Sequence, residues 1–258
     1  MGGIHGAAAM SGRVVVGFHA VGARLRHAAD SIEALYFDPQ RRDARMRQLL
    51  DRARAAQVRL VEADGRRLQG LAGEAPHQGV VAVCGELALA RSLEDVLDAV
   101  TPATLLLLLD GVTDPRNLGA CLRVADAAGA AAVVVPRDRS AALTEVASKA
   151  AAGAAETLPL IAVTHLARAL EQMREAGIWI AGAAGEADRT LYELDLNGPF
   201  AWALGAEGEG LRRLTREHCD WLVRIPMAGH VDSLNVSVAA GVCLFETVRQ
   251  RGAAAAAH

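Results

Sequence analysis

Short apolar runs in the second half of the chain, all but the last uninterrupted, restrict its fold more than any other feature. They lie at Leu105–Leu109, Ala132–Val135, Ile178–Ala181, Ala201–Leu204 and Leu222–Ile225. A strand that is apolar at every position, rather than at every second one, needs a layer on both faces of its sheet. From Thr104 onward the sequence therefore predicts a doubly wound α/β domain with a parallel sheet.

The first part of the chain predicts a smaller α/β domain. Short β-branched or apolar runs flanked by turn residues indicate strands at Ile32–Phe37, Val58–Val61 and Val80–Cys84. Between the first two, apolar residues recur at helical spacing at Met46, Leu49, Leu50 and Ala53. A more polar stretch, ending at a proline, follows. We predict a small domain over residues 13–85, a linker over 86–103 and a larger domain over 104–252.

The composition excludes several classes of protein. Of the 258 residues, 52% are hydrophobic, which is too many for a disordered chain. The longest strongly apolar run is far shorter than the ~20 residues that span a bilayer, so no membrane helix is expected. The first residues do not resemble a secretory signal. We expect a reducing cytoplasm and buried free thiols, because no disulfide or metal-binding spacing connects Cys84, Cys121, Cys219 and Cys243.

The charge of the chain limits how it could bind nucleic acid. The formal net charge of -3 argues against binding by bulk electrostatics, so any contact with phosphates must come from local patches. One candidate patch is Arg41, Arg42 and Arg45. A solvated helix face explains these arginines equally well, because Asp43 and Asp51 dilute their charge. The scattered histidines predict no metal site.

Three loops follow predicted strands at the edge where parallel sheets bind ligands. The first reads DGVTDPRNLGACLRVADAAGA. Asn117 is expected to cap the helix that follows, and Arg123 lies nearly two turns further along. A ligand that spans the mouth of the helix could contact both residues. An ordinary helix cap with an exposed arginine is the alternative.

The second loop, LGAEGEG, combines glycines with carboxylates. Its spacing matches neither a dinucleotide fingerprint nor a phosphate-binding loop. Glu207 and Glu209 would repel a phosphate, so the loop favours a cationic or neutral cofactor over a nucleotide-dependent oxidoreductase. A flexible acidic turn is the alternative.

The third loop reads IPMAGHVDSLNVSVAAG. Asn235 is expected to cap a helix that runs to about Val248. The first turns of this helix carry small side chains. His230, Asp232 and Ser233 are too close in sequence to form a hydrolase triad. Close packing of this helix against the sheet would explain its small residues as well as a binding site would.

Together these three segments resemble the three motifs of the TrmH/SpoU family in the SPOUT superfamily of RNA methyltransferases. The resemblance extends through PRDRSA, AGEADRTLY and GAEGEGLRRLTREHCD and covers Gly17–Gly252. It implies a trefoil-knotted catalytic domain, a preceding domain similar to RNA-binding ribosomal proteins, and a homodimer. It also implies S-adenosylmethionine as cofactor and methylation of a ribose 2'-hydroxyl. Within the family, the likeness is to members that act on a guanosine of 23S ribosomal RNA.

The same resemblance assigns the site residues. It places the cofactor around Gly205, Ile225, Met227 and Leu234. The reacting centre would be lined by Asn117, Arg123, Glu207, Ser233 and Asn235. Arg212 and Arg213 join the arginines of the small domain as expected RNA contacts. His230 and Asp232 occupy positions where the family pattern has smaller residues, which puts the fine substrate preference in doubt.

Two alternatives remain open within this reading. A transfer RNA ribose methyltransferase of the same superfamily shares the chemistry and differs in its target. A non-catalytic RNA-binding or ribosome-assembly factor would keep the fold without the activity. Retention of Asn117, Arg123, Glu207 and Asn235 together argues against the second.

Overall fold

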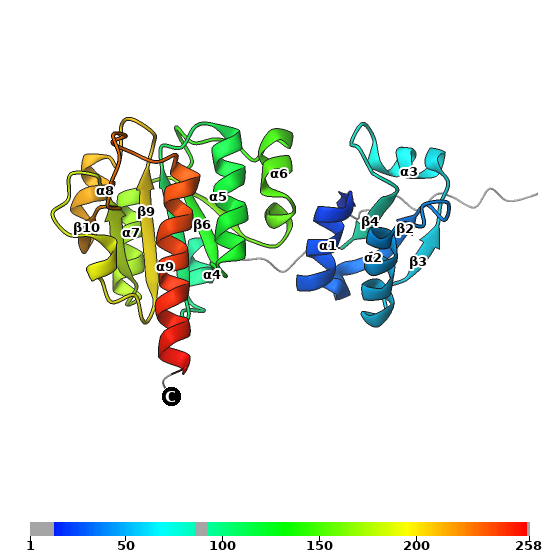
Figure 1. The fold of residues 1–258 in the computed structure, drawn as a ribbon, viewed down its shortest axis with the longest axis horizontal. Helices are drawn as coiled ribbons and strands as arrows, with labels where there is room; N and C mark the ends of the chain where they lie inside the picture. Colours follow the sequence, from blue (N-terminus) through cyan, green and yellow to red (C-terminus); the bar gives the residue numbers. More distant parts are fainter. Residues whose placement is uncertain (1–12, 86–91, 257–258) are drawn as a thin grey trace, which may run out of the picture. The chain divides into compact units, whose positions relative to one another are not determined.

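The computed structural model describes residues 13–85 and 92–256, which fall into two compact units (Figure 1). The first unit ends at Ala88 and the second begins at Leu89. Residues 86–91, at the start of the predicted linker, lie outside the described residues. The rest of that stretch contains a helix, α4 (Leu93–Leu97), whose Leu93 and Val96 are buried in a core of the second unit. This part of the stretch therefore belongs to a folded unit.

The first unit is a four-stranded sheet with the order β1-β4-β2-β3. Its elements are β1 (Arg13–Val16), α1 (Phe18–His27), β2 (Ile32–Phe37), α2 (Ala44–Ala55), β3 (Leu60–Glu62), α3 (Gly65–Ala72) and β4 (Val80–Cys84). Strand β4 is antiparallel to β1 and β2, whereas β2 and β3 are parallel. The predicted strands Ile32–Phe37 and Val80–Cys84 are confirmed at their stated bounds as β2 and β4.

Helix α2 explains why β3 begins later than predicted. The four apolar positions that predicted this helix, Met46, Leu49, Leu50 and Ala53, are all buried. Gln57 then adopts a left-handed conformation with φ 56°, and the Val58 amide donates to the carbonyl of Ala53 at 2.9 Å. This closing bond is typical of a helix C-terminus. Val58 therefore completes the helix instead of starting a strand.

The second unit is built on a six-stranded sheet with the order β10-β8-β9-β5-β6-β7. The strands are β5 (Leu105–Asp110), β6 (Ala132–Pro136), β7 (Leu160–Val163), β8 (Trp179–Ala183), β9 (Phe200–Gly205) and β10 (Trp221–Val223). Every neighbouring pair is parallel, which confirms the predicted α/β class. The edge strand β7 was missed by the sequence analysis. The trefoil knot stays a prediction.

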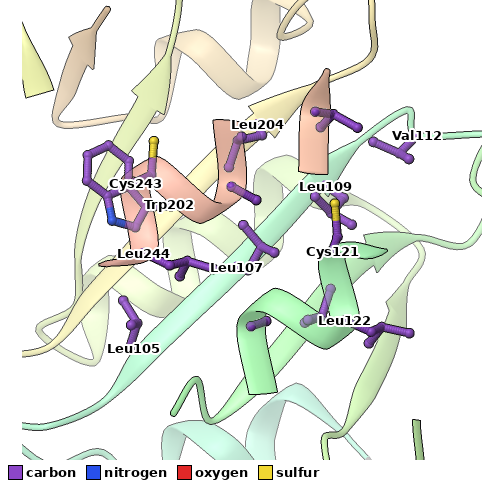
Figure 2. Close-up of a cluster of buried hydrophobic side chains, with 14 of the residues drawn as sticks. Leu105, Leu107, Leu109, Val112, Cys121, Leu122, Trp202, Leu204, Cys243 and Leu244 are labelled. Atoms are coloured by element: carbon purple, nitrogen blue, oxygen red, sulfur yellow. The ribbon is translucent and has the colours of Figure 1, made fainter. Parts of the chain in front are cut away.

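Alternate residues of β5 face two different cores, so helices cover both faces of the sheet. Leu105, Leu107 and Leu109 pack with α5 (Pro115–Ala127), α6 (Glu145–Ala151) and α9 (Val236–Ala256), as Figure 2 shows in part. Leu106 and Leu108 pack on the other face with α4 and α7 (Leu166–Glu175). All five leucines are at most 1% exposed, and each fully buried leucine contributes about 1.5–3 kcal/mol.

The buried thiols follow from the same packing. Cys121 and Cys243 lie in the core of Figure 2, where burial raises the pKa of each thiol to about 12. Cys84 is also buried, whereas Cys219 is only partly so. In the described part of the chain, no cluster of three potential metal ligands is present. No described helix is long and apolar enough to cross a membrane.

The long helix α9 is held along its length. Asn235 caps it, as predicted, by accepting a hydrogen bond from the Ser237 amide at 3.0 Å. The helix continues to Ala256, past its predicted end near Val248. The later turns are held by Arg251, which donates to the backbone carbonyls of Ala103 at 2.7 Å and Gly198 at 2.6 Å.

A buried hydrogen bond ties the same helix to the sheet and gives a test of the fold. The Trp202 indole Nε1 donates to Thr247 Oγ1 at 2.9 Å, and both side chains are fully buried. We expect Thr247→Val to lower the free energy of unfolding by about 1–3 kcal/mol, because it leaves the indole N–H without an acceptor. Urea denaturation measures this loss. In a Trp202→Phe background the same change should cost much less; equal losses in both backgrounds would contradict the assignment.

Candidate functional site

The three predicted loops meet at the carboxyl edge of the second unit's sheet. Strands β5 and β9 are neighbours in register, with Asp110 opposite Gly205. Strand β8 pairs with β9 on its other side and with β10 beyond. The loops that follow β5, β9 and β10 therefore leave the sheet at one edge. Their side chains can converge there although up to 118 residues of sequence separate them.

A hydrogen-bonded cluster joins the three loops. Asn235 Nδ2 donates to Asn117 Oδ1 at 2.9 Å and to Glu207 Oε1 at 2.5 Å. Asn117 Nδ2 and the Val236 amide lie 3.4 and 3.3 Å from the same carboxylate oxygen. Because all these donors address Oε1, the carboxylate is held in one orientation at the beginning of α9. Three residues assigned to the reacting centre are thus brought together.

The predicted capping role of Asn117 is wrong, and the correction explains how it reaches the cluster. Asp114 caps α5 by accepting a hydrogen bond from the Arg116 amide at 2.9 Å, and Pro115 is the first helical residue. Proline is favoured at that position because its missing N–H would have no partner there. Asn117 lies inside the first turn, so its side chain is free to bond Glu207 and Asn235.

A cavity of about 480 Å³ lies between the same loops. Its lining includes all four residues assigned to the cofactor, together with two assigned to the reacting centre: Gly205, Ile225, Met227, Leu234, Glu207 and Ser233. The volume falls within the range of about 300–1,000 Å³ that is typical of small-molecule sites. Asn117, Arg123 and Asn235 are not among its lining residues.

The charged lining of this cavity is mainly acidic. It includes Glu186, Glu207, Glu209 and Asp232, against the single cation Arg216. Arg216 forms an ion pair with Glu186, whose pKa is lowered by a hydrogen bond from its own backbone amide and then by Arg216. The remaining carboxylates would repel a phosphate and attract a cation. The cavity suits a positively charged cofactor.

The sequence analysis did not single out two parts of the site. The last residue of β8, Ala183, and the segment that follows it to Glu186 also line the cavity. Asp110 was read only as the first residue of the first loop, yet its carboxylate is 1% exposed and it ends strand β5. Its Oδ2 accepts hydrogen bonds from the Arg212 amide at 3.0 Å and from Thr215 Oγ1 at 2.7 Å. A charged residue at the end of an otherwise apolar strand was the available signal.

Arg123 is not brought to the cluster within one chain. It is exposed on α5 and makes no hydrogen bond or ion pair with any described residue. Six residues separate it from Asn117, which places it about 9 Å along the helix and about 120° around it. The two side chains therefore leave α5 in different directions.

The arginines expected to bind RNA differ in whether their guanidiniums already have partners within the chain. Arg212 Nε lies 3.5 Å from the buried carboxylate of Asp110, and Arg213 pairs with Glu217 at 2.5 Å. In the first unit, Arg41 pairs with Asp43 at 2.6 Å. The Arg41 and Arg45 guanidiniums also lie 4.5 and 4.7 Å from the centre of the Phe18 ring. Arg42 is exposed and has no ion-pair partner among the described residues.

Comparison with protein families assigns both units. Residues 104–245 match the model of the SpoU rRNA Methylase family. Residues 14–90 match a family described as RNA 2'-O ribose methyltransferase substrate binding.

Several relatives match almost the whole chain. The 23S rRNA (guanosine-2'-O-)-methyltransferase RlmB of Ralstonia nicotianae is 59% identical over 93% of this chain and 96% of its own length. The RlmB of Pseudomonas aeruginosa is 54% identical over 92% of this chain and 96% of its own.

Solved structures agree with this assignment. The SpoU methyltransferase AviRb from Streptomyces viridochromogenes, in complex with the cofactor AdoMet, has 30% sequence identity and a TM-score of 0.67. That match covers 93% of this chain and 90% of AviRb. The family model, the relatives and these structures all match the unit that carries the three loops. The chain belongs to the SpoU rRNA methylase family.

Proposed function

We propose that the chain transfers a methyl group from S-adenosylmethionine to the ribose 2'-hydroxyl of a guanosine in 23S ribosomal RNA. The observation that carries this proposal is the acidic cavity beside the cluster of Asn117, Glu207 and Asn235. Relatives that are 53–59% identical over 93% of this chain carry the name of this activity. Ribosomal RNA as substrate places the enzyme in the cytoplasm.

The residues of the cavity fit the cofactor. S-adenosylmethionine supplies an electrophilic methyl group on a positively charged sulfur. Ile225, Met227 and Leu234 give the cavity apolar surface for an adenine ring, and Gly205 lets backbone approach closely. Glu207, held by two amide side chains, gives a fixed negative charge for the sulfonium. Ser233 lies on the cavity wall and can donate a hydrogen bond.

The acceptor hydroxyl must be aligned and must lose its proton. An arginine guanidinium stays protonated at neutral pH and therefore does not serve as a base. Arg123 therefore holds an RNA phosphate beside the target ribose and stabilises negative charge that develops on the oxygen. Asn117 and Asn235 keep the Glu207 carboxylate in place, and Glu207 or solvent accepts the proton.

The first unit is the RNA-binding domain in this proposal. Residues 13–85 present Arg41, Arg42 and Arg45 near the beginning of α2. Arg42 is the arginine of this group that is available for phosphate, because the Phe18 ring and Asp43 already engage the other two.

A homodimer explains an exposed apolar stripe on α9. Val238, Phe245 and Val248 are 51%, 47% and 38% exposed and follow one another at helical spacing. Helix α9 packs beside α5 through Gly241 and Val124, so the stripe lies next to the helix that carries Arg123 (Figure 1). Large apolar side chains in a row mark an interface. A second copy of the chain would cover them and could supply Arg123 to a neighbouring site.

The activity can be tested directly with RNA that lacks modifications. Incubation of the chain and labelled S-adenosylmethionine with 23S ribosomal RNA should yield a 2'-O-methylated guanosine, detected by mass spectrometry of the digested RNA. Transfer RNA is the control substrate and should remain unlabelled. Label in transfer RNA alone would support the alternative target. Cofactor binding by calorimetry without transfer to either RNA would favour an assembly factor.

Gly205 offers a sharp test of the cofactor site. A Cβ at this position would lie 1.9 Å from the backbone carbon of Gly210, so Gly205→Ala must open the loop. We expect the affinity for S-adenosylmethionine to fall at least about tenfold, measured by calorimetry. Gly185→Ala is the matched control, because Gly185 lines the same cavity but its Cβ would meet nothing nearer than 3.8 Å. Equal losses in the two variants would contradict this reading.

Mixing two inactive variants tests the proposed sharing of Arg123. Arg123→Ala and Asn235→Ala should each lose most turnover. If copies share a site, a refolded equimolar mixture should recover about a quarter of the wild-type activity, because half of the dimers are mixed and each contains one intact site. Sedimentation velocity confirms the dimer. If the mixture is no more active than the variants alone, Arg123 acts within its own chain.

A further inference from the structure

A second cavity opens at the same edge of the sheet, beyond the three loops of the cofactor site. It measures about 600 Å³ and is lined by β7 itself, by residues that follow β6 and β7, and by parts of α4 and α7. Arg137 comes directly after β6, and His165 and Arg168 follow β7. None of these side chains takes part in the proposed methyl transfer.

The cationic side chains of this cavity are free to bind a ligand. Arg137, His165 and Arg168 are exposed and form no ion pair with any described residue. The loop that carries Arg137 is held in place, since the Arg137 amide donates to the carbonyl of Val163 at 2.7 Å. Unpaired guanidiniums on the loop after β6 and on the first turn of α7 provide forked donors that match a phosphate group.

Glu94 is the acidic residue among the lining side chains, and its charge offsets only one of the two guanidiniums. Its pKa is lowered by hydrogen bonds from its own backbone amide, then from Ser92, with a further contribution from Gln172. The carboxylate is therefore bound to the beginning of α4. Two arginines face one carboxylate that already has its own donors, and the cavity as a whole favours an anion.

The sheet topology places this cavity beside the reacting centre. From β9, where the cofactor loop begins, the order runs through β5 and β6 to β7. At ~4.8 Å per strand, three steps span about 14 Å. That length corresponds to about four stacked nucleotides, at 3.4 Å each, and to fewer in an extended strand.

We propose that Arg137 and Arg168, with His165, form a binding site for a backbone phosphate of the substrate RNA, a few nucleotides from the target ribose. This inference rests on the proposed function, because it takes RNA as the substrate. The site would hold the acceptor strand on the catalytic unit and so fix which nucleotide lies at the cofactor. It reads phosphate and not base identity.

The test compares the double variant Arg137→Gln/Arg168→Gln with Arg139→Gln. Arg139 lies on the same loop and is exposed, but does not line the cavity. Its left-handed backbone, φ 58°, is one that glutamine already adopts at Gln57 and Gln78. Binding of unmodified 23S ribosomal RNA is measured at several salt concentrations, and the affinity for S-adenosylmethionine and the melting temperature are measured in parallel.

We expect the double variant to bind the RNA about tenfold more weakly, as for the loss of exposed charge-assisted contacts. The slope of log affinity against log salt should fall by about 0.7, the value for one lost single-strand phosphate contact. Cofactor affinity and melting temperature should match those of Arg139→Gln. KM for RNA should rise with kcat unchanged at saturating RNA.

RNA affinity and salt slope equal to those of Arg139→Gln would overturn the proposal. So would an effect seen only with ribosomal particles and not with naked RNA, because the cavity would then bind a protein. If the wild-type chain binds RNA but methylates none, the proposed function fails. The salt dependence of binding would still decide whether this cavity holds a phosphate.

Discussion

The buried carboxylate of Asp110 is the constraint on which the catalytic edge depends. It lies at the end of β5, and its hydrogen bonds to the Arg212 amide and the Thr215 hydroxyl fix the chain just after the glycine loop. Gly205 fixes the beginning of that loop, since it packs directly against the backbone of Gly210. The loop is thus held at both ends, and Glu207 between them reaches Asn235 at 2.5 Å. Burying the Asp110 charge costs folding free energy, but the buried carboxylate holds the residues of the loop in a fixed arrangement.

The sequence predicted those parts of the molecule in which local pattern and tertiary packing agree. Apolar runs predicted five of the six parallel strands, because burial on both faces favours apolar residues. Edge strand β7 was missed although all four of its residues are apolar. Asn117 was misread as a cap, since Asp114 and Pro115 provide a better helix start in the same segment. The residue at which a helix begins depends on which of several neighbouring residues makes the better cap.

The residues assigned to the site also differ in how well the sequence predicts their positions. The four residues that the resemblance assigns to the cofactor line one cavity because each follows or ends a strand of one parallel sheet, and strand order alone nearly determines that result. Arg123 is different, because its position depends on the helix phase: a residue six places after Asn117 leaves α5 about 120° away. The order of the motifs in the sequence does not say whether Arg123 acts in its own chain or in a second copy. A reacting centre can therefore be recognised from sequence before its geometry is known.

The two cavities on this edge carry opposite charge, and this separation suits a reaction between a cation and a polyanion. The carboxylates Glu207 and Glu209 line the cavity beside β9, whereas Arg137 and Arg168 line the cavity beside β7. An acidic pocket that lay alone at the edge would attract the cofactor and repel the RNA strand that must approach it. Cations placed a few strands away offset that repulsion without neutralising the cofactor pocket, because exposed charges are screened over about 8–10 Å. The modest net charge of the whole chain is therefore compatible with RNA as substrate.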